Sequence, residues 1–299
     1  MWFSSMDDFI NKTSELGQFK RVDWNKNFLP TTAAVAGEWH CLTKWDGNPA
    51  TGTIYNTGTN LAFQATSDTT VWAGGMQHWG NVSPATKHII NASAFSAAAT
   101  SVPWVLMLID LLGFYRVTTV TTTTAQTLNN TVTIPRYTDW AWVQAFIWNT
   151  NTVAMGAGTP NLSINYTNSA GTAGRITPTV LPIGKTAGAN GLILYSGTGA
   201  GKYWPFMPLQ SGDAGIRSIQ SFTSSTSYVS GEYSIGLCKP LLTLPLTTIG
   251  VASERDLMNQ IPSLPQVVDG ANLVWLYYSG VATPVNTSYF GHLDFAWGN

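Results

Sequence analysis

His292 and Asp294 are the two side chains whose spacing is best suited to acid–base chemistry. They lie two residues apart in the segment 289–298, in which apolar and polar residues alternate. On a β-strand this spacing places both side chains on one face, where a carboxylate can orient an imidazole for proton transfer. The sequence places no nucleophile beside them, and both residue types are common on the exposed face of a strand. We therefore expect no catalysis at this pair and predict that the protein is not an enzyme.

The glycine-rich segment 197–202 resembles a phosphate-binding loop in composition only. Ser196 occupies the position of the first glycine of such a loop, and Tyr203 replaces the Ser or Thr that binds magnesium. Trp204 and Pro205 then prevent a helix from following. We interpret this segment as a flexible turn.

Metal and thiol chemistry are not indicated either. No two of the four histidines have the H-x-x-x-H or H-x-H spacing that is typical of a metal site. Cys41 and Cys238 belong to no Cys-x-x-Cys pair, and we expect two buried free thiols. The sequence thus predicts no catalytic, cofactor-binding or metal-binding residues, and no cofactor.

Tryptophan is the residue type most able to form a binding surface in this chain. There are 13 tryptophans. Trp140 and Trp142 are expected to share one face of a strand, and Trp148 to fall on the same face. Exposed aromatic rings in this arrangement stack on sugars, which makes a carbohydrate-binding or adhesin module the alternative hypothesis, with a glycan as its partner. The same rings fit a subunit interface or a core, which we favour because almost no charge surrounds them.

The low content of charged residues excludes further classes of function. Only 10% of the 299 residues are charged, and the formal net charge is −1, whereas ordinary domains carry about 25% charged residues. Lys and Arg total 14, too few for a surface that coats nucleic acid, and no apolar run reaches the roughly 18 residues that span a membrane. A surface of Thr, Ser, Asn and Gly hydrates without long-range repulsion, which suits a subunit that packs against copies of itself.

The first residues predict an amphipathic helix that acts as an arm. Ser5 and Asp8 form a capping box, Phe9 and Ile10 lie on an apolar stripe, and Gly17 ends the pattern. The start of the chain also lacks the basic and apolar regions of a secretory signal. We expect Phe9 and Ile10 to contact neighbouring subunits.

Two further helices are expected. Ser83 followed by Pro84, with good helix formers after them, predicts a helix over 84–99. A cap at Ser253 predicts a short helix over 253–261.

Most of the remaining chain is typical of short β-strands separated by clusters of turn-forming residues. The expected strands are 104–109, 131–134, 142–148, 162–166, 216–222, 233–238, 273–278 and 289–298. This pattern predicts a mainly β fold, a jelly-roll-like β-sandwich with an N-terminal helix or arm and one or two short inserted helices. We expect two parts: an N-terminal helix, arm and loop-rich region over 1–80, and a β-sandwich domain over 81–299 that includes the helix 84–99.

The Thr-rich residues that follow Val117, together with 131–134, are expected to be extended because β-branched residues favour strands. Two interpretations remain open: a hairpin that faces solvent, and a polar edge that pairs between subunits.

Three segments, 80–88, 211–220 and 289–298, resemble parts of virion proteins from tailed bacteriophages. The resemblance implies a capsid or capsid-decoration role without catalytic residues, and it transfers no functional residue to this chain. A tailed-phage major capsid subunit of the usual kind has a long spine helix and an extended charged loop, and neither is evident here.

Together these observations predict a structural protein of a virion, from a bacteriophage, that forms or decorates the capsid shell. Its expected partners are copies of itself, in a homotrimer or a higher symmetric assembly, and other capsid proteins. The expected location is the virion, after synthesis in the host cytoplasm.

Overall fold

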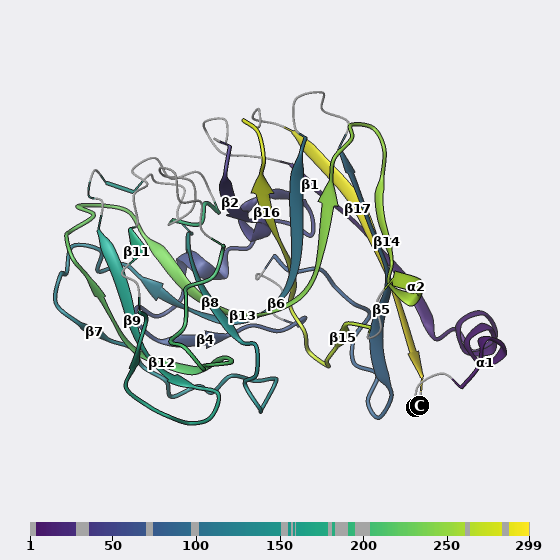
Figure 1. Ribbon diagram of the computed structural model, residues 1–299, viewed down its shortest axis with the longest axis horizontal. Coiled ribbons are helices and arrows are strands. Elements are labelled where there is room, and N and C mark those ends of the chain that lie inside the picture. Colours follow the sequence, from purple (N-terminus) through teal and green to yellow (C-terminus); the bar gives the residue numbers. More distant parts are fainter. Residues whose placement is uncertain are drawn as a thin grey trace.

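The computed structural model shows three β-sheets side by side (Figure 1). The residues that it describes are 4–27, 36–69, 74–96, 102–150, 155–156, 158, 160–178, 181–182, 191–194, 204–260, 264–282 and 287–298.

The first sheet is here called the terminal sheet because it holds the first and last long strands. Its order is β14 (Ser253–Asp256), β5 (Thr86–Ser96), β17 (Ser288–Gly298), β1 (Phe19–Asn27) and β3 (Asp46–Asn48), with β15 (Gln266–Val267) also paired to β5.

The second sheet is the central sheet, which lies between the other two (Figure 1). Its order is β2 (Glu38–Cys41), β16 (Leu273–Ser279), β6 (Trp104–Val117), β13 (Tyr233–Leu246) and β8 (Gln144–Asn149), with β4 (Phe63–Ala65) also paired to β6.

The third sheet is the inserted sheet, formed by residues between β6 and β13. Its order is β10 (Arg175–Ile176), β9 (Asn161–Asn168), β12 (Ile216–Ser224) and β7 (Gln126–Thr127), with β11 (Leu181–Pro182) also paired to β9. The helical elements are short: α1 (Met6–Ile10), a π-helical turn (Asn11–Glu15), 3-10 turns (Leu42–Lys44 and Ile54–Asn56) and α2 (Leu257–Gln260).

Eight of these strands form a jelly roll. Numbered in chain order, β1, β2, β5, β6, β13, β14, β16 and β17 follow the order 1-8-3-6 in the terminal sheet and 2-7-4-5 in the central sheet. All the neighbouring strands are antiparallel. Eight antiparallel strands shared between two packed sheets in this order define this architecture. The prediction of a mainly β, jelly-roll-like sandwich with a short N-terminal helix is therefore confirmed.

Two cores hold the three sheets together, and β6 contributes to both. Successive side chains of a strand point to opposite faces. Trp104, Leu106 and Leu108 accordingly pack in the core that contains the terminal-sheet residues, whereas Met107 and Ile109 pack in the core that contains the inserted-sheet residues. The central sheet is thus covered on both faces, which explains why its long strand is almost continuously apolar.

A buried ion pair links the jelly roll to the insertion. Asp110 of β6 is fully buried, and its carboxylate accepts two hydrogen bonds from the Arg136 guanidinium, at 2.9 and 2.7 Å. The carboxylate also accepts the Asn272 main-chain N–H at 2.9 Å. Arg136 donates further to the main-chain oxygens of Thr66, at 2.8 Å, and Leu111, at 3.2 Å. Every charged atom of this pair therefore has partners, as burial requires.

The helix predicted over 84–99 is wrong, since Thr86–Ser96 forms β5. This strand lies between β14 and β17, so both of its edges are hydrogen-bonded. Ala92 and Ala94 are completely buried and face the core, where their small side chains suit close packing. Sheet pairing and burial outweigh the local helix preference of the Ala-rich run.

The N-terminal helix is confirmed, including its cap. The Ser5 Oγ accepts the main-chain N–H of Asp8 at 3.1 Å, and Gly17 has the positive φ of 66° that suits a helix end. The helix predicted over 253–261 is correct only in part. Ser253–Asp256 is strand β14, and α2 follows it as Leu257–Gln260.

The strand predicted over 131–134 is wrong, since residues 131–132 form a bend and residues 133–134 have no regular secondary structure. The extended Thr-rich hairpin is wrong for the same reason: residues 118–125 are loop and turn, and the strand that follows is the two-residue β7. The other predicted strands correspond to β6, β8, β9, β12, β13, β16 and β17. Strands from the first 80 residues pair with the last two strands of the chain, β1 with β17 and β2 with β16. The division into two domains at residue 80 stays a prediction.

Cys41 and Cys238 are both free and buried, as predicted. Burial raises the pKa of the Cys41 thiol to about 11. Neither thiol is therefore in an environment that activates it as a nucleophile.

Lys87 connects β5 to the segment that precedes it. Its buried Nζ donates to the main-chain oxygens of His78 and Gly80 and lies 3.1 Å from His78 Nδ1. Asp68 lies 3.6 Å from the other ring nitrogen of His78. Burial, and then the charge of Lys87, lower the pKa of His78, because a proton on Nδ1 would face the ammonium group.

Replacing Arg136 with Met is expected to lower the free energy of unfolding by about 3–5 kcal/mol, because it leaves the Asp110 carboxylate buried without its cationic partner. Urea denaturation measures this loss. The double variant Asp110→Asn, Arg136→Met removes both charges and should be more stable than Arg136→Met alone. A single variant as stable as the wild type would contradict the importance of the pair.

The stability of the protein is expected to fall on mild acidification. Because the pKa of His78 is lower in the folded than in the unfolded protein, the unfolded chain binds more protons below about pH 6.5. The contribution of His78 is complete above this pH and is lost as the pH falls through the lowered folded pKa. The urea midpoint should therefore decrease from about pH 7.5 to about pH 5. His78→Gln, whose amide oxygen can accept from Lys87, should show a smaller decrease, and an equal decrease would refute this explanation.

Candidate functional site

The turn before β8 holds three aromatic residues in the left-handed backbone region. Tyr137, Trp140 and Trp142 have φ angles of 56°, 50° and 64°. Such angles are strained for bulky side chains and persist where surrounding contacts enforce them, as often happens at functional sites. Here the Trp140 N–H donates to the Tyr137 oxygen at 2.7 Å, and the Trp142 N–H donates to the Ala214 oxygen at 2.8 Å. We call residues 137–143 the tryptophan turn.

Gly215 allows the loop before β12 to reach the tryptophan turn. A Cβ at this position would lie 2.1 Å from the Trp140 oxygen and 2.9 Å from the Trp142 nitrogen. Any other residue would therefore displace the turn. The next residue continues the contact, because the Ile216 N–H donates to the Val143 oxygen at 3.0 Å.

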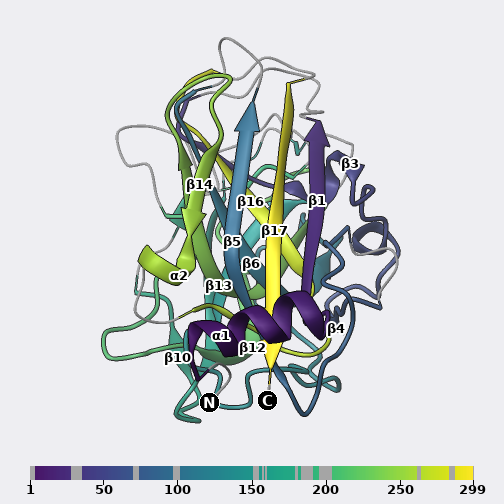
Figure 2. The same cartoon turned by 90° about the vertical axis from the view of Figure 1, so that its right-hand side faces the viewer.

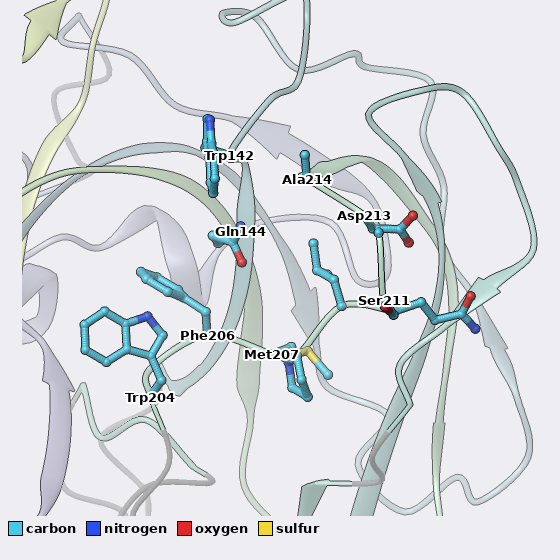
Figure 3. A pocket seen from close by; sticks show the side chains of 12 residues that line it. Trp142, Gln144, Trp204, Phe206, Met207, Ser211, Asp213 and Ala214 are labelled. Atoms are coloured by element: carbon cyan, nitrogen blue, oxygen red, sulfur yellow. The ribbon is translucent and has the colours of Figure 1, made fainter.

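Trp142 borders a groove on the insertion with a volume of about 490 Å³, within the size range of ligand pockets. Figure 3 shows Trp142 on one side, Trp204 and Phe206 on the other, and Gln144 between them. The Trp142 side chain is 66% exposed and that of Trp204 is 60% exposed. The residues that line this groove, here called the tryptophan groove, are Trp142, Gln144, Trp204, Phe206, Met207, Pro208, Leu209, Gln210, Ser211, Gly212, Asp213 and Ala214.

The loop 207–214 is fixed from within the insertion by Asp213. Its carboxylate accepts hydrogen bonds from the Tyr166 hydroxyl at 2.6 Å, from the Asn168 amide at 2.7 Å and from Arg175 Nε at 2.9 Å. The Tyr166 oxygen also accepts the Gln210 main-chain N–H at 2.8 Å. Burial opposes ionisation of Asp213, but these donors hold the pKa of its carboxyl below the usual value. Burial and the neighbouring carboxylate raise the pKa of Tyr166 to about 12.

The described residues of the groove consequently offer hydrogen bonds but no free charge. The carboxylate of Asp213 is used by its three partners. The side-chain amides of Gln144 and Gln210 make no hydrogen bond within the described ranges and can both donate and accept. The arrangement can bind an uncharged ligand that has both an apolar face and hydroxyl or amide groups.

The structure does not place Trp140, Trp142 and Trp148 on one strand face, so this prediction is wrong. β8 begins only at Gln144, so Trp140 and Trp142 lie in the tryptophan turn and not on the strand. Trp148 is completely buried and stacks on Phe146, with 4.7 Å between ring centroids.

Only Trp142 of these three residues lies on the groove. Trp140 is half-buried, and the guanidinium of Arg217 lies 4.3 Å from the centre of its ring. An interface role for Trp140 and Trp142 stays a prediction, whereas the full burial of Trp148 assigns it to the core.

Sequence reasoning missed Trp204, Phe206 and the loop after them. The aromatic pair that flanks Pro205 was a usable signal, and so was the nearby run of Gly, Asp and Ala residues at 212–215. Nothing in the sequence pattern connects this segment to Trp142, because the contact depends on the path of the insertion.

The N-terminal helix presents apolar side chains to solvent. Figure 2 shows α1 crossing the ends of β5, β17 and β1 on the outer side of the terminal sheet. Phe9 is half-buried, whereas Met6, Ile10 and Leu16 are 65%, 50% and 61% exposed. None of the α1 residues is buried. The interface role of Phe9 and Ile10 stays a prediction.

The residues considered for catalysis do not form a reactive pair. His292 Nε2 lies 3.8 Å from Asp294 Oδ2, but the Asp294 carboxylate accepts two hydrogen bonds from Arg21, at 2.7 and 2.8 Å. The glycine-rich segment 197–202 lies outside the described residues.

Two general findings apply to the part of the chain that the structure describes. No three His, Cys, Asp or Glu side chains there are grouped so that they could hold a metal ion. No helix there is long and apolar enough to cross a membrane.

Trp148→Ala is expected to lower the free energy of unfolding by about 3–5 kcal/mol, because it opens a cavity in the core. Trp142→Ala removes an exposed ring and should change the same quantity by less than about 1 kcal/mol. Urea denaturation of both variants checks the assignment of one ring to the core and the other to the surface. Similar losses in the two variants would contradict it.

The comparisons with known proteins add nothing to the fold assignment, which rests on the strand order. No protein-family model matches the chain, and no curated protein sequence matches it. Among solved structures, the unassembled KI polyomavirus VP1 pentamer is similar at 9% sequence identity and a TM-score of 0.23, over 95% of each chain. A likeness at this TM-score supports no inference about what this chain does.

Proposed function

We propose that this protein is a non-catalytic structural protein of a virion, which forms or decorates the capsid shell by self-association. The observation that carries the proposal is the exposed apolar surface of the N-terminal helix on the outer side of a jelly-roll body. A bacteriophage is the source implied by the resemblance of the three sequence segments. The proposed location is the virion, after synthesis in the host cytoplasm.

The N-terminal helix has the properties of an arm that binds a neighbouring copy. A helix this short gains most of its stability from packing of its apolar side. The terminal sheet supplies little of that packing, because Met6, Ile10 and Leu16 are all at least half exposed. A partner that covers these side chains would stabilise the helix and bury apolar surface in the same step.

A second apolar feature lies on the outer face of the same sheet. The rings of Phe95 and Phe290 stack there, with 5.3 Å between their centroids. They border a hollow of about 320 Å³ that lies over Gly291. We propose that this hollow accepts the N-terminal helix of another copy, since a contact between different surfaces of identical chains can close into a ring.

Pairing between sheet edges is a weaker route to assembly in this protein. The edge strands of the terminal sheet, β3 and β14, have only three and four residues. β14 also carries Glu254 and Arg255. Short, charged edge strands disfavour the addition of another strand.

The jelly roll is compatible with the proposal by analogy only. Viral capsid proteins and lectins both use this fold, and fold alone does not determine function. Other capsid proteins are the further partners proposed, and a homotrimer or a larger symmetric assembly is the proposed product.

Replacing Ile10 with Asp is expected to reduce self-association, because the carboxylate would have to be desolvated in the contact. Sedimentation velocity over a concentration series, with negative-stain imaging, compares this variant with the wild type. Ile176→Asp is the matched control, since Ile176 is the same residue type and equally exposed, at 50%, but lies on β10 of the inserted sheet. A wild-type protein that remains monomeric at all concentrations would refute the proposal, as would equal effects of the two variants.

A further inference from the structure

We infer that the tryptophan groove is a binding site for a neutral saccharide. The inference goes beyond self-association and does not depend on it, because the groove belongs to the insertion and not to the N-terminal helix. It rests on three features of the described groove residues: two exposed indole rings, two side-chain amides that make no hydrogen bond to other described residues, and a fixed loop whose one carboxylate is paired.

The rings of Trp142 and Trp204 are available to a ligand and are held in position. Trp142 is fixed by its positive φ and by the hydrogen bond from its N–H to the Ala214 oxygen. The Trp204 ring packs edge-on against Trp39, with 5.9 Å between centroids. Indole rings provide large apolar faces at a small entropic cost, and the apolar face of a pyranose ring can stack on them.

The polar groups of the groove match hydroxyl groups. A sugar hydroxyl both donates and accepts a hydrogen bond, and so does the amide of a Gln side chain. Gln144 lies between the two aromatic sides of the groove (Figure 3), and Gln210 lies on the fixed loop. Neither amide has a hydrogen-bond partner among the described residues. These groups are therefore free to specify the orientation of a sugar.

The charge distribution favours a neutral saccharide over an acidic one. The groove contains one carboxylate, Asp213, and its partner Arg175 neutralises it at 2.9 Å. Among the residues that the structure describes, no lysine or arginine lines the groove. An anionic sugar would thus lose hydration without gaining a cationic partner.

The fixed loop reduces the entropic cost of binding. The Tyr166 hydroxyl donates to the Asp213 carboxylate and accepts the Gln210 main-chain N–H. These two bonds fix both ends of the segment 210–213. A site that is already ordered loses less conformational freedom when a ligand binds.

A proline-rich peptide is the competing ligand for a groove lined by aromatic rings. Its prolines lack N–H groups, so they offer acceptors only. The two amide oxygens of the groove would then remain without donors. A saccharide supplies both donors and acceptors, and we therefore commit to a saccharide.

The test is binding of the full chain to an array of neutral and acidic oligosaccharides, followed by calorimetric titration with the neutral saccharides bound best. Trp142→Gly and Trp204→Ala are each expected to weaken this binding by at least about tenfold. Glycine suits the positive φ at position 142, so loss of binding in that variant is not caused by unfolding. Circular dichroism and urea denaturation confirm that each variant is folded.

Trp79→Ala is the matched control, because Trp79 is also exposed, at 59%, and also has a positive φ, but it borders a different cavity. It should bind the saccharide as the wild type does. Absence of binding to every neutral saccharide at millimolar concentration would overturn the inference. Binding that survives both groove variants, that is lost in Trp79→Ala, or that is confined to a proline-rich peptide would overturn it as well.

Discussion

The buried ion pair of Asp110 and Arg136 is the interaction on which the arrangement of the molecule depends. Asp110 lies in the middle of β6, the strand that serves both cores, and Arg136 comes from the insertion. Separating two charges inside a protein leaves each without compensation, so the pair fixes the insertion relative to the jelly roll. The strained tryptophan turn starts at Tyr137, directly after this fixed point. The position of Trp142 in the groove therefore follows from an interaction in the core.

The two candidate surfaces lie on different parts of the molecule. The N-terminal helix lies against the terminal sheet, whereas the tryptophan groove belongs to the insertion on the other side of the central sheet (Figure 1). The central sheet between them packs against one core on each face. Binding at one surface need not disturb the other, so a shell contact and a ligand site can coexist in one chain.

The sequence predicted the strands better than it predicted the helices or the groove. Alternating apolar residues made β9 recognisable, because this period reflects the two faces of a sheet. The continuous apolar run made β6 recognisable, since a strand buried on both faces is apolar throughout. β5 was predicted as a helix because its Ala and Ser residues carry no strong strand signal, and its pairing partners β14 and β17 lie far away in the sequence. The shared face of Trp140, Trp142 and Trp148 failed because positive φ angles enforced by tertiary contacts are not visible in a residue pattern.

The distribution of the few charges explains how one composition supports both proposals. Four guanidinium–carboxylate pairs each have a carboxylate that is nearly or fully buried: Arg136–Asp110, Arg116–Glu232, Arg175–Asp213 and Arg21–Asp294. A chain with only 10% charged residues thus uses many of its charges internally. The remaining surface repels other copies weakly, so modest apolar contacts suffice for association. The same internal pairing neutralises Asp213 in the tryptophan groove, so the described lining offers a ligand mainly aromatic faces and amides.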